Sequence, residues 1–219
     1  MLTITCERPL LVVRFPDMRN MVSWAVNRPG FVRARDVVWL EVGNLELQHE
    51  ADPVAWFDRM LARRGLGEAV GLMTARDVSR YEHVVSRVED MRADCVITLG
   101  LNNGEHIGRR ARPEMHPLNA GTINILCAVS VPLSQAALLE AMSVATQART
   151  VALLETGYQR PKHEGVVTGT GTDCIVISAP DQPEPQMFAG MHTAIGEAIG
   201  RSVYRATLDA ARKWRAERG

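Results

Sequence analysis

Strand-like segments follow one another in this sequence with no long helical segment between them, and this order constrains the sheet that they can build. Residues 10–15 and 36–42 form one such pair, with a turn at 27–30, and residues 84–88 and 95–99 form a second. Their valines and isoleucines are typical of strands. Because a parallel pair needs a long crossover connection, usually a helix, successive strands favour antiparallel pairing. The sequence therefore predicts a mixed sheet rather than a purely parallel one.

Helical periodicity appears in three places. A short helix begins at Asp52-Pro53, where an N-cap precedes proline, and Gly65 stops it. A long helix starts near Ser134 and ends at Gly157. The last helix has apolar residues three and four positions apart, namely Ile195, Ile199, Val203, Ala206, Ala210 and Trp214. Residues 74–77 resemble a capping box and predict one more short helix.

The remaining apolar runs complete the fold-class prediction. Residues 69–73, 122–131 and 174–178 are expected to be strands. Together with the helices they indicate an α/β (α+β-like) fold, with a mixed β-sheet on which the long helices pack. We expect residues 1–219 to form one domain, because the sequence contains neither an internal repeat nor a linker rich in proline, glycine or serine.

Charge and cysteine content narrow the protein class. Lysine and arginine together number 25, as do aspartate and glutamate, and this balance disfavours a nonspecific nucleic-acid binder. No apolar run reaches the roughly 18–20 residues that cross a bilayer, and the N-terminus is unlike a secretory signal. The four cysteines are far apart and lack zinc-site spacing. We therefore expect a cytoplasmic protein with reduced thiols and neither nucleic-acid nor membrane partners.

The segment 168–173, Thr-Gly-Thr-Gly-Thr-Asp, stands directly before a predicted strand. Glycine allows backbone amides to approach a ligand, and the hydroxyls and the carboxylate can bind polar groups. It could thus form a polar wall of a binding site. It could equally be a turn whose threonines satisfy their own backbone. A P-loop is excluded, because no Gly-Lys-Ser/Thr follows and the next element is a strand.

Three further polar segments lie at strand or helix ends, at 119–124, 102–106 and 190–193. The last precedes a helix, whose free N–H groups suit an anion, so His192 is a candidate base or ligand, although such a residue is more often a cap. Glu197 in the first turns complements the helix dipole. These features favour an enzyme with a polar substrate but name no reaction.

Four segments, in order, resemble the adenosylcobinamide amidohydrolase family: 121–124 (GTIN), 145–153, 168–173 (TGTGTD) and 192–197. Residues 70–75 and 98–102 are also similar to that family, and the resemblance runs from about residue 69 to 206. It implies hydrolysis of the amide that joins the aminopropanol arm of adenosylcobinamide to the corrin ring, which gives adenosylcobyric acid. The substrate carries cobalt, and the resemblance does not specify a protein-bound cofactor or metal.

For amide hydrolysis the site needs a nucleophile, a base and an oxyanion donor. Asp173 or His192 is our candidate base, and the nucleophile is water or one of Thr168, Thr170 and Thr172. Backbone amides of Gly169 and Gly171 would hold the oxyanion with Asn124. The remaining candidates for substrate binding are Asn102, Asn103, Thr122 and Glu197. Asp173→Asn or His192→Ala is expected to lower the rate at least roughly a hundredfold.

Other interpretations stay open at this point. His192, Asp173 and Glu197 could instead hold a metal, although their spacing matches no known template. The chain could hydrolyse an amide or ester of another bulky metal chelate, such as a siderophore, or bind a corrinoid without turnover. Gly196 and Gly200, one turn apart, suit either a homodimer interface or packing against the sheet.

Overall fold

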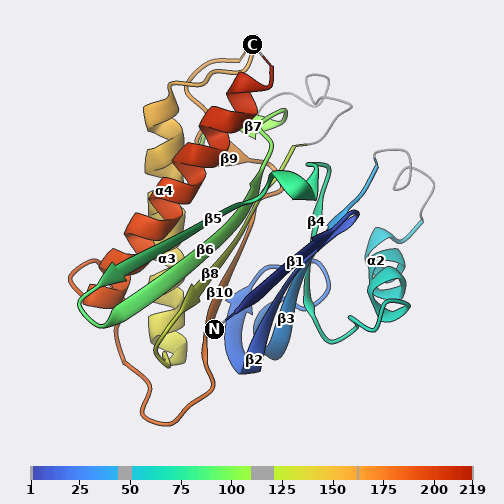
Figure 1. Ribbon diagram of the computed structural model, residues 1–219. Helices are drawn as coiled ribbons and strands as arrows, with labels where there is room; N and C mark the ends of the chain where they lie inside the picture. The colour runs from blue at the N-terminus through green and yellow to red at the C-terminus, as the bar shows by residue number, and fades with distance from the viewer. Residues whose placement is uncertain (1, 44–50, 110–120, 162, 219) are drawn as a thin grey trace.

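A computed structural model describes residues 2–43, 51–109, 121–161 and 163–218 (Figure 1). The main sheet has the order β4-β3-β2-β10-β8-β6-β5, and β1 pairs with β2 beside this path. Its strands are β1 (Thr3–Glu7), β2 (Leu10–Ser23), β3 (Gly30–Glu41), β4 (Val70–Thr74), β5 (Glu82–Val88), β6 (Met91–Leu99), β8 (Ile123–Val129) and β10 (Cys174–Pro180). A small ribbon consists of β7 (Gly104–Glu105) and β9 (Gly169–Thr170).

The long strand β2 folds the sheet into two facing layers. Its first half pairs with β1 and its second half with β10, and the register against β3 shifts between Arg14 and Arg19. Buried side chains of β2, β3 and β4 therefore meet those of β6, β8 and β10 in one core cluster, which includes Leu11, Trp39, Leu72, Val96, Leu126 and Val176. Alternation along each strand places the next residues on the outer faces.

Helices cover both outer faces. On one side, α3 (Gln135–Thr156) and α4 (Ala194–Ala216) pack on β6, β8 and β10 through a large apolar cluster that includes Ile125, Ala141 and Ile199. On the other, α2 (Pro53–Ala62) packs Phe57 and Leu61 against β3. The molecule is thus a helix–sheet–sheet–helix sandwich, in which Figure 1 shows α3 and α4 on one side and α2 on the other.

The predicted mixed sheet with long helices is confirmed. Strands β10 and β8 are parallel, as are β3 and β4, whereas the other pairs of the main sheet are antiparallel. Ser134 caps α3 and Gly157 ends it in the left-handed conformation, with φ of 63°. The four cysteines are free. None of the helices described here has the length and apolar character needed to span a bilayer.

The capping box predicted at 74–77 does not open a helix at Thr74. Thr74 is the last residue of β4, where it pairs with Glu41 of β3, so the chain is still extended at that point. A single 3-10 turn, η1 (Val78–Arg80), follows instead, and the Asp77 side chain caps it by accepting from the Ser79 amide. Sheet pairing therefore overrides the capping signal at Thr74. The residue that acts as the cap is Asp77, three positions later.

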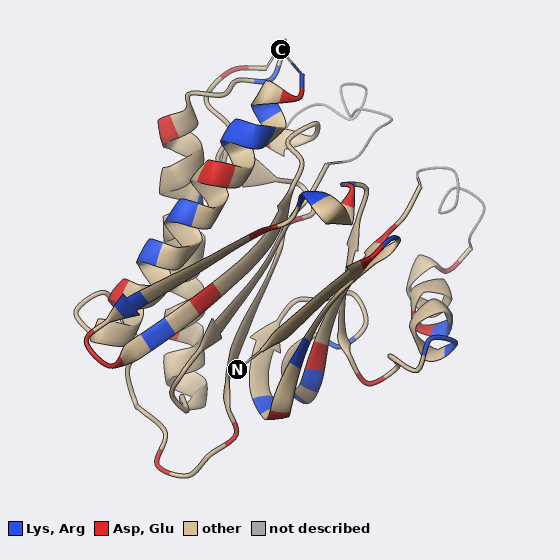
Figure 2. Ribbon diagram, in the orientation of Figure 1, with Lys and Arg blue, Asp and Glu red and all other residues tan. Residues whose placement is uncertain are grey.

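The charged end of α4 is held by its neighbours. Arg76 donates two hydrogen bonds to the Glu217 carboxylate, at 2.6 and 2.9 Å, and the Arg218 guanidinium lies 4.2 Å from the centre of the Trp214 ring. Figure 2 shows charged residues of both signs spaced along this helix. Gly196, at its other end, leaves room for the carbonyls of Ala189 and Gly190, so the close backbone approach at this glycine is made within the chain.

Candidate functional site

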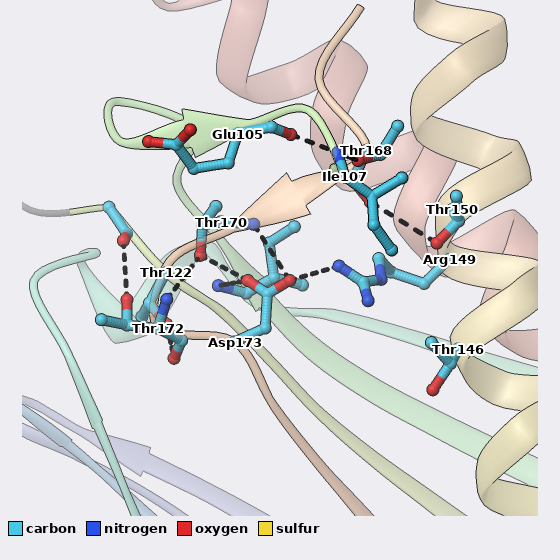
Figure 3. A network of polar contacts seen from close by, with 12 residues as sticks. Glu105, Ile107, Thr122, Thr146, Arg149, Thr150, Thr168, Thr170, Thr172 and Asp173 are labelled. Atoms are coloured by element: carbon cyan, nitrogen blue, oxygen red, sulfur yellow. Dashed lines mark hydrogen bonds and ion pairs between the residues drawn. The ribbon is translucent and has the colours of Figure 1, made fainter. Parts of the chain in front are cut away.

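The polar segments 100–103, 121–122 and 168–173 meet at one edge of the sheet. Because β8 and β10 are parallel neighbours, with Asn124 opposite Cys174, the residues preceding both strands lie side by side. The β7–β9 ribbon adds Gly104 and Glu105 at the same edge, opposite Thr170 and Gly169. Figure 3 shows the resulting network around Asp173. We call this group of segments the Asp173 end of the sheet.

The Asp173 carboxylate accepts four hydrogen bonds. The Ile123 amide and the Thr170 hydroxyl donate to Oδ1, while the Thr170 amide and an Arg149 guanidinium N–H donate to Oδ2. Arg149 comes from α3, and the two side chains are only 11% and 9% exposed. The carboxylate therefore joins the threonine-glycine loop, the start of β8 and a helix.

Burial raises the pKa of Asp173 above its ordinary value. The Arg149 cation and the hydrogen bonds from Thr170 and Ile123 act in the opposite direction, but the loss of solvation outweighs them. A carboxylate with a raised pKa is a stronger proton acceptor than an ordinary aspartate. This electrostatic environment suits a general base at the point where the Thr170 hydroxyl donates its hydrogen bond.

The threonine hydroxyls have different partners. Thr122 donates to the Thr172 carbonyl at 2.7 Å, and Thr172 donates to the Gly121 carbonyl at 3.2 Å. Thr168 accepts from the Ile107 amide at 2.8 Å and donates to the Glu105 carbonyl at 3.3 Å. Of the three threonines in the loop, Thr170 alone contacts the Asp173 carboxylate. The hydroxyls of Thr168 and Thr172 bond backbone groups of the segments 105–107 and 121, rather than the backbone of their own turn.

Two glycines of the cluster are required by packing, and a third is not. A side chain at Gly169 would occupy the space through which Arg149 reaches Asp173. A Cβ at Gly121 would lie 2.5 Å from the Gly100 carbonyl oxygen and 2.8 Å from the Asn102 amide nitrogen. Gly171 has open space around it, and its amide is absent from the hydrogen bonds of the described residues. That N–H is free to bind an oxyanion.

The three candidate asparagines lie in different environments. Asn103 is in the cluster, where its side chain accepts from the Gly121 amide at 3.2 Å and donates to Thr172 at 3.5 Å. Asn102 is next to it, with its backbone close to Gly121. Asn124 is buried between the two sheet layers and donates its side-chain amide to the Met73 carbonyl of β4 at 2.7 Å. Residues 119–120 of this predicted segment lie outside the described residues.

His192 and Glu197 are not brought to this cluster. They flank the start of α4, which follows the other end of β10, and the seven residues of that strand correspond to about 20 Å. Both residues are exposed, and Glu197 forms an ion pair with Arg201 one turn later. The structure therefore separates the two candidate bases, and it separates the three residues considered as metal ligands. The described residues contain no group of three or more His, Cys, Asp or Glu that could hold a metal.

Several residues of the site escaped sequence reasoning. Arg149 is the main one, because its partner is 24 positions away and comes from a different element. Trp24, at the end of β2, donates its indole N–H to the Asp173 carbonyl and is 48% exposed. His106, from the predicted polar segment 102–106, bonds the Val166 carbonyl through Nδ1 at 2.7 Å, beside the same loop. For Arg149, the available sequence signal was an arginine among the small residues of the segment 145–153.

Comparison with known proteins gives a family. A family model described as adenosylcobinamide amidohydrolase matches residues 2–219, so the similarity includes the N-terminal third as well as residues 69–206. An adenosylcobinamide amidohydrolase of Methanosarcina mazei is 32% identical over 146 residues, which are 63% of each chain. An uncharacterized protein of Methanocaldococcus jannaschii is 35% identical over 96 residues, which are 41% of this chain and 35% of that protein.

The matched region thus spans less than two thirds of the length of either curated relative. Among solved structures, a Pyrococcus horikoshii protein is 10% identical, with 93% of this chain and 77% of that chain covered. Its TM-score is 0.42, and a similarity this low supports no argument about activity.

Proposed function

The chain belongs to the adenosylcobinamide amidohydrolase family, and from this premise we propose that it hydrolyses the amide of the aminopropanol arm in adenosylcobinamide or a related corrinoid. The observation that carries the proposal is the family match over residues 2–219, together with the M. mazei relative. The products would be adenosylcobyric acid and aminopropanol. Cobalt belongs to the substrate in this scheme.

In the proposed reaction Thr170 and Asp173 act together. The hydrogen bond from the Thr170 hydroxyl to the Asp173 carboxylate favours this pair, because proton transfer requires such contact. Asp173 takes the hydroxyl proton while Thr170 Oγ1 forms a bond to the amide carbon. The same proton then passes to the nitrogen as the carbon–nitrogen bond breaks, and aminopropanol leaves.

Water completes the proposed cycle. It attacks the ester on Thr170, Asp173 accepts a proton from it, and that proton returns to Thr170 Oγ1 as the corrinoid acid leaves. The free amide of Gly171 would stabilise the negative charge on the substrate oxygen in both steps. Asn102, Asn103 and Thr122 would bind amides of the corrin periphery from the same edge.

Arg149 has a supporting role in this scheme. Its ion pair holds the carboxylate against the Thr170 backbone and hydroxyl, and it partly offsets the effect of burial on the pKa of Asp173. His192 and Glu197 have no part in the proposed chemistry, since they lie at the other end of β10. We also propose a cytoplasmic location, in keeping with four free cysteines, and a homodimer that measurement of the solution mass would test.

The test is incubation of the purified protein with adenosylcobinamide, with mass spectrometry of the products. Formation of adenosylcobyric acid and free aminopropanol in equal amounts supports the proposal. Saturable binding of intact adenosylcobinamide without aminopropanol release would instead make the chain a corrinoid-binding protein. Cleavage of an iron–siderophore amide or ester, with adenosylcobinamide unchanged, would assign the hydrolase to another metal chelate.

A further inference from the structure

A cavity lies at the opposite end of β10 from Asp173, and nothing in the proposed function uses it. Its volume is about 580 Å³. It lies between the irregular part of β2 on one side and the ends of β8 and β10 with the start of β6 on the other, so both sheet layers contribute to its walls. Side chains that line it include Phe15, Arg19, Arg92, Asp94, Ser130 and Asp181.

Arg19 is held in a fixed position in the wall of this cavity. Its Nε donates to the Ser178 hydroxyl at 3.1 Å, and its Nη2 donates to the carbonyls of Val129 and Ser178 at 2.6 and 2.9 Å. The guanidinium carbon lies 4.7 Å from the centre of the Phe15 ring. All of these partners are neutral. They orient the cation without neutralising it.

The acids around the cavity are committed elsewhere or lie in solvent. Asp94 accepts two hydrogen bonds from Arg92, both at 2.7 Å, and a third contact from His83 at 3.0 Å. Asp181 is paired with Arg33 and accepts from Asn20. Asp17 is exposed, and Asp94 and Asp17 act on Arg19 only through their fields, which partly offset the effect of burial on its pKa. Among the described residues, Arg19 therefore forms no ion pair.

Arg19 is partly buried, and a cation that loses part of its solvation without forming an ion pair is disfavoured. Burial lowers the pKa of Arg19 to about 10, which still leaves it protonated at neutral pH. The three hydrogen bonds use Nε and Nη2, so the two N–H groups of Nη1 have no partner among the described residues. These two N–H groups, held in place by the other hydrogen bonds, can donate to oxygens of a carboxylate or phosphate.

We propose that this cavity is a second binding site, which takes the oxyanion group of a small ligand, a carboxylate or a phosphate, with the Arg19 guanidinium as its anchor. The bound anion would form the direct ion pair that Arg19 lacks among the described residues. Three features support this site: the cavity itself, the neutral hydrogen-bond partners of Arg19, and the pairing of Asp94 and Asp181 with other arginines. It stands whether or not the Asp173 end hydrolyses an amide.

The test is titration of the intact protein with inorganic phosphate, and separately with acetate, by calorimetry at constant ionic strength. We expect saturable binding of phosphate, acetate or both, with a dissociation constant of about 1 mM or below. Tighter binding of phosphate identifies a phosphate ligand, and equal or tighter binding of acetate identifies a carboxylate. Absence of saturation by either anion would overturn the proposal.

Two substitutions and a control tie the binding to Arg19. Arg19→Met should abolish binding, whereas Arg14→Gln, on the same strand but paired with Asp36 outside the cavity, should leave it unchanged. Asp17→Asn removes an exposed negative charge that would repel the bound anion, so it should tighten anion binding about threefold. If Arg19→Met does not fold, the Asp17→Asn result decides, because an unchanged affinity there contradicts an Arg19-centred site. Binding that survives in folded Arg19→Met also overturns it.

Discussion

Asp173 and Asp94 are two buried carboxylates at opposite ends of the same sheet, and the fold treats them differently. Both side chains are less than 10% exposed and both pair with an arginine. Burial acts to raise the pKa of each. At Asp94, hydrogen bonds from His83 and Arg92 outweigh burial and hold the pKa below its ordinary value, whereas at Asp173 burial prevails and the pKa is raised.

In the proposed mechanism, this difference separates a structural carboxylate, Asp94, from a reactive one, Asp173. Asp94 has a bidentate arginine and a histidine, which stabilise its charged form. Asp173 has one arginine N–H, two backbone amides and a threonine hydroxyl, so it keeps more affinity for a proton. A shifted pKa next to a hydroxyl nucleophile is the pattern expected of a catalytic site.

The largest expected effect is on hydrolysis in Asp173→Asn. The amide cannot accept the Thr170 proton, so the rate of aminopropanol release should fall at least about a hundredfold. Asp36→Asn is the matched control, because it removes a carboxylate that pairs with exposed Arg14 far from this loop. Circular dichroism must show that both variants are folded. A folded Asp173→Asn protein with the wild-type rate would remove Asp173 from the mechanism.

The next effect concerns Gly121 and Gly171, two of the three glycines described at the Asp173 end. Gly121→Ala forces a methyl group against the backbone of Gly100 and Asn102, so it should lower the free energy of unfolding by about 1–3 kcal/mol. It should also slow hydrolysis. At Gly171 the same methyl group meets open space, so Gly171→Ala should change the free energy of unfolding by no more than about 0.5 kcal/mol. Urea unfolding of the pair checks this, and equal losses would contradict the packing described.

The two carboxylates should also give opposite dependences of stability on pH. The lowered pKa of Asp94 contributes stability above the unfolded pKa, and this is lost as the pH falls through the folded pKa. The raised pKa of Asp173 contributes stability at low pH, and this is lost as the pH rises through its folded pKa.

From pH 7 to pH 3, the unfolding free energy should therefore fall less steeply in Asp94→Asn than in wild type, and more steeply in Asp173→Asn. Chemical denaturation at a series of pH values measures both slopes. Slopes that change in the same direction would show that the two environments do not differ as described.

The smallest effect is expected for His192→Ala. The sequence offered His192 as one of two candidate bases, but it is exposed and lies about one strand length from Asp173. We now expect its rate of aminopropanol release to stay within about twofold of wild type. A hundredfold loss would show that His192 acts in the same site as Asp173. It would contradict the assignment of the reaction to the Asp173 end alone.

Much of the fold could be predicted, because local patterns determine it. The apolar spacing from Ile195 to Trp214 gave α4, and Ser134 with Gly157 gave both ends of α3. The folding of the sheet into two layers could not be predicted in this way. It depends on the register shift of β2 between Arg14 and Arg19, which exchanges β1 for β10 as its neighbour.

The candidate site was predicted in part for a related reason. The loop 168–173 and residues 121–122 were identified by their glycines and polar side chains ahead of apolar runs, and the parallel pairing of β8 and β10 brings them to one edge. Asn124 looked equivalent to its neighbours, but the alternation of β8 turns it into the space between the sheets, where it bonds the Met73 carbonyl. The pairing of Arg149 with Asp173 depends on how α3 packs on β10, and no local pattern specifies that contact.

The central claim is that Thr170 and Asp173 act as one catalytic unit, and a double-mutant cycle on aminopropanol release from adenosylcobinamide tests it most directly. Thr170→Ala and Asp173→Asn should each lower the rate at least about a hundredfold, and the double variant should be no slower than the slower single variant. Thr146→Ala, on α3, serves as the control for loss of a hydroxyl. Losses that multiply in the double variant, or a Thr170→Ala protein with the wild-type rate, would contradict the account.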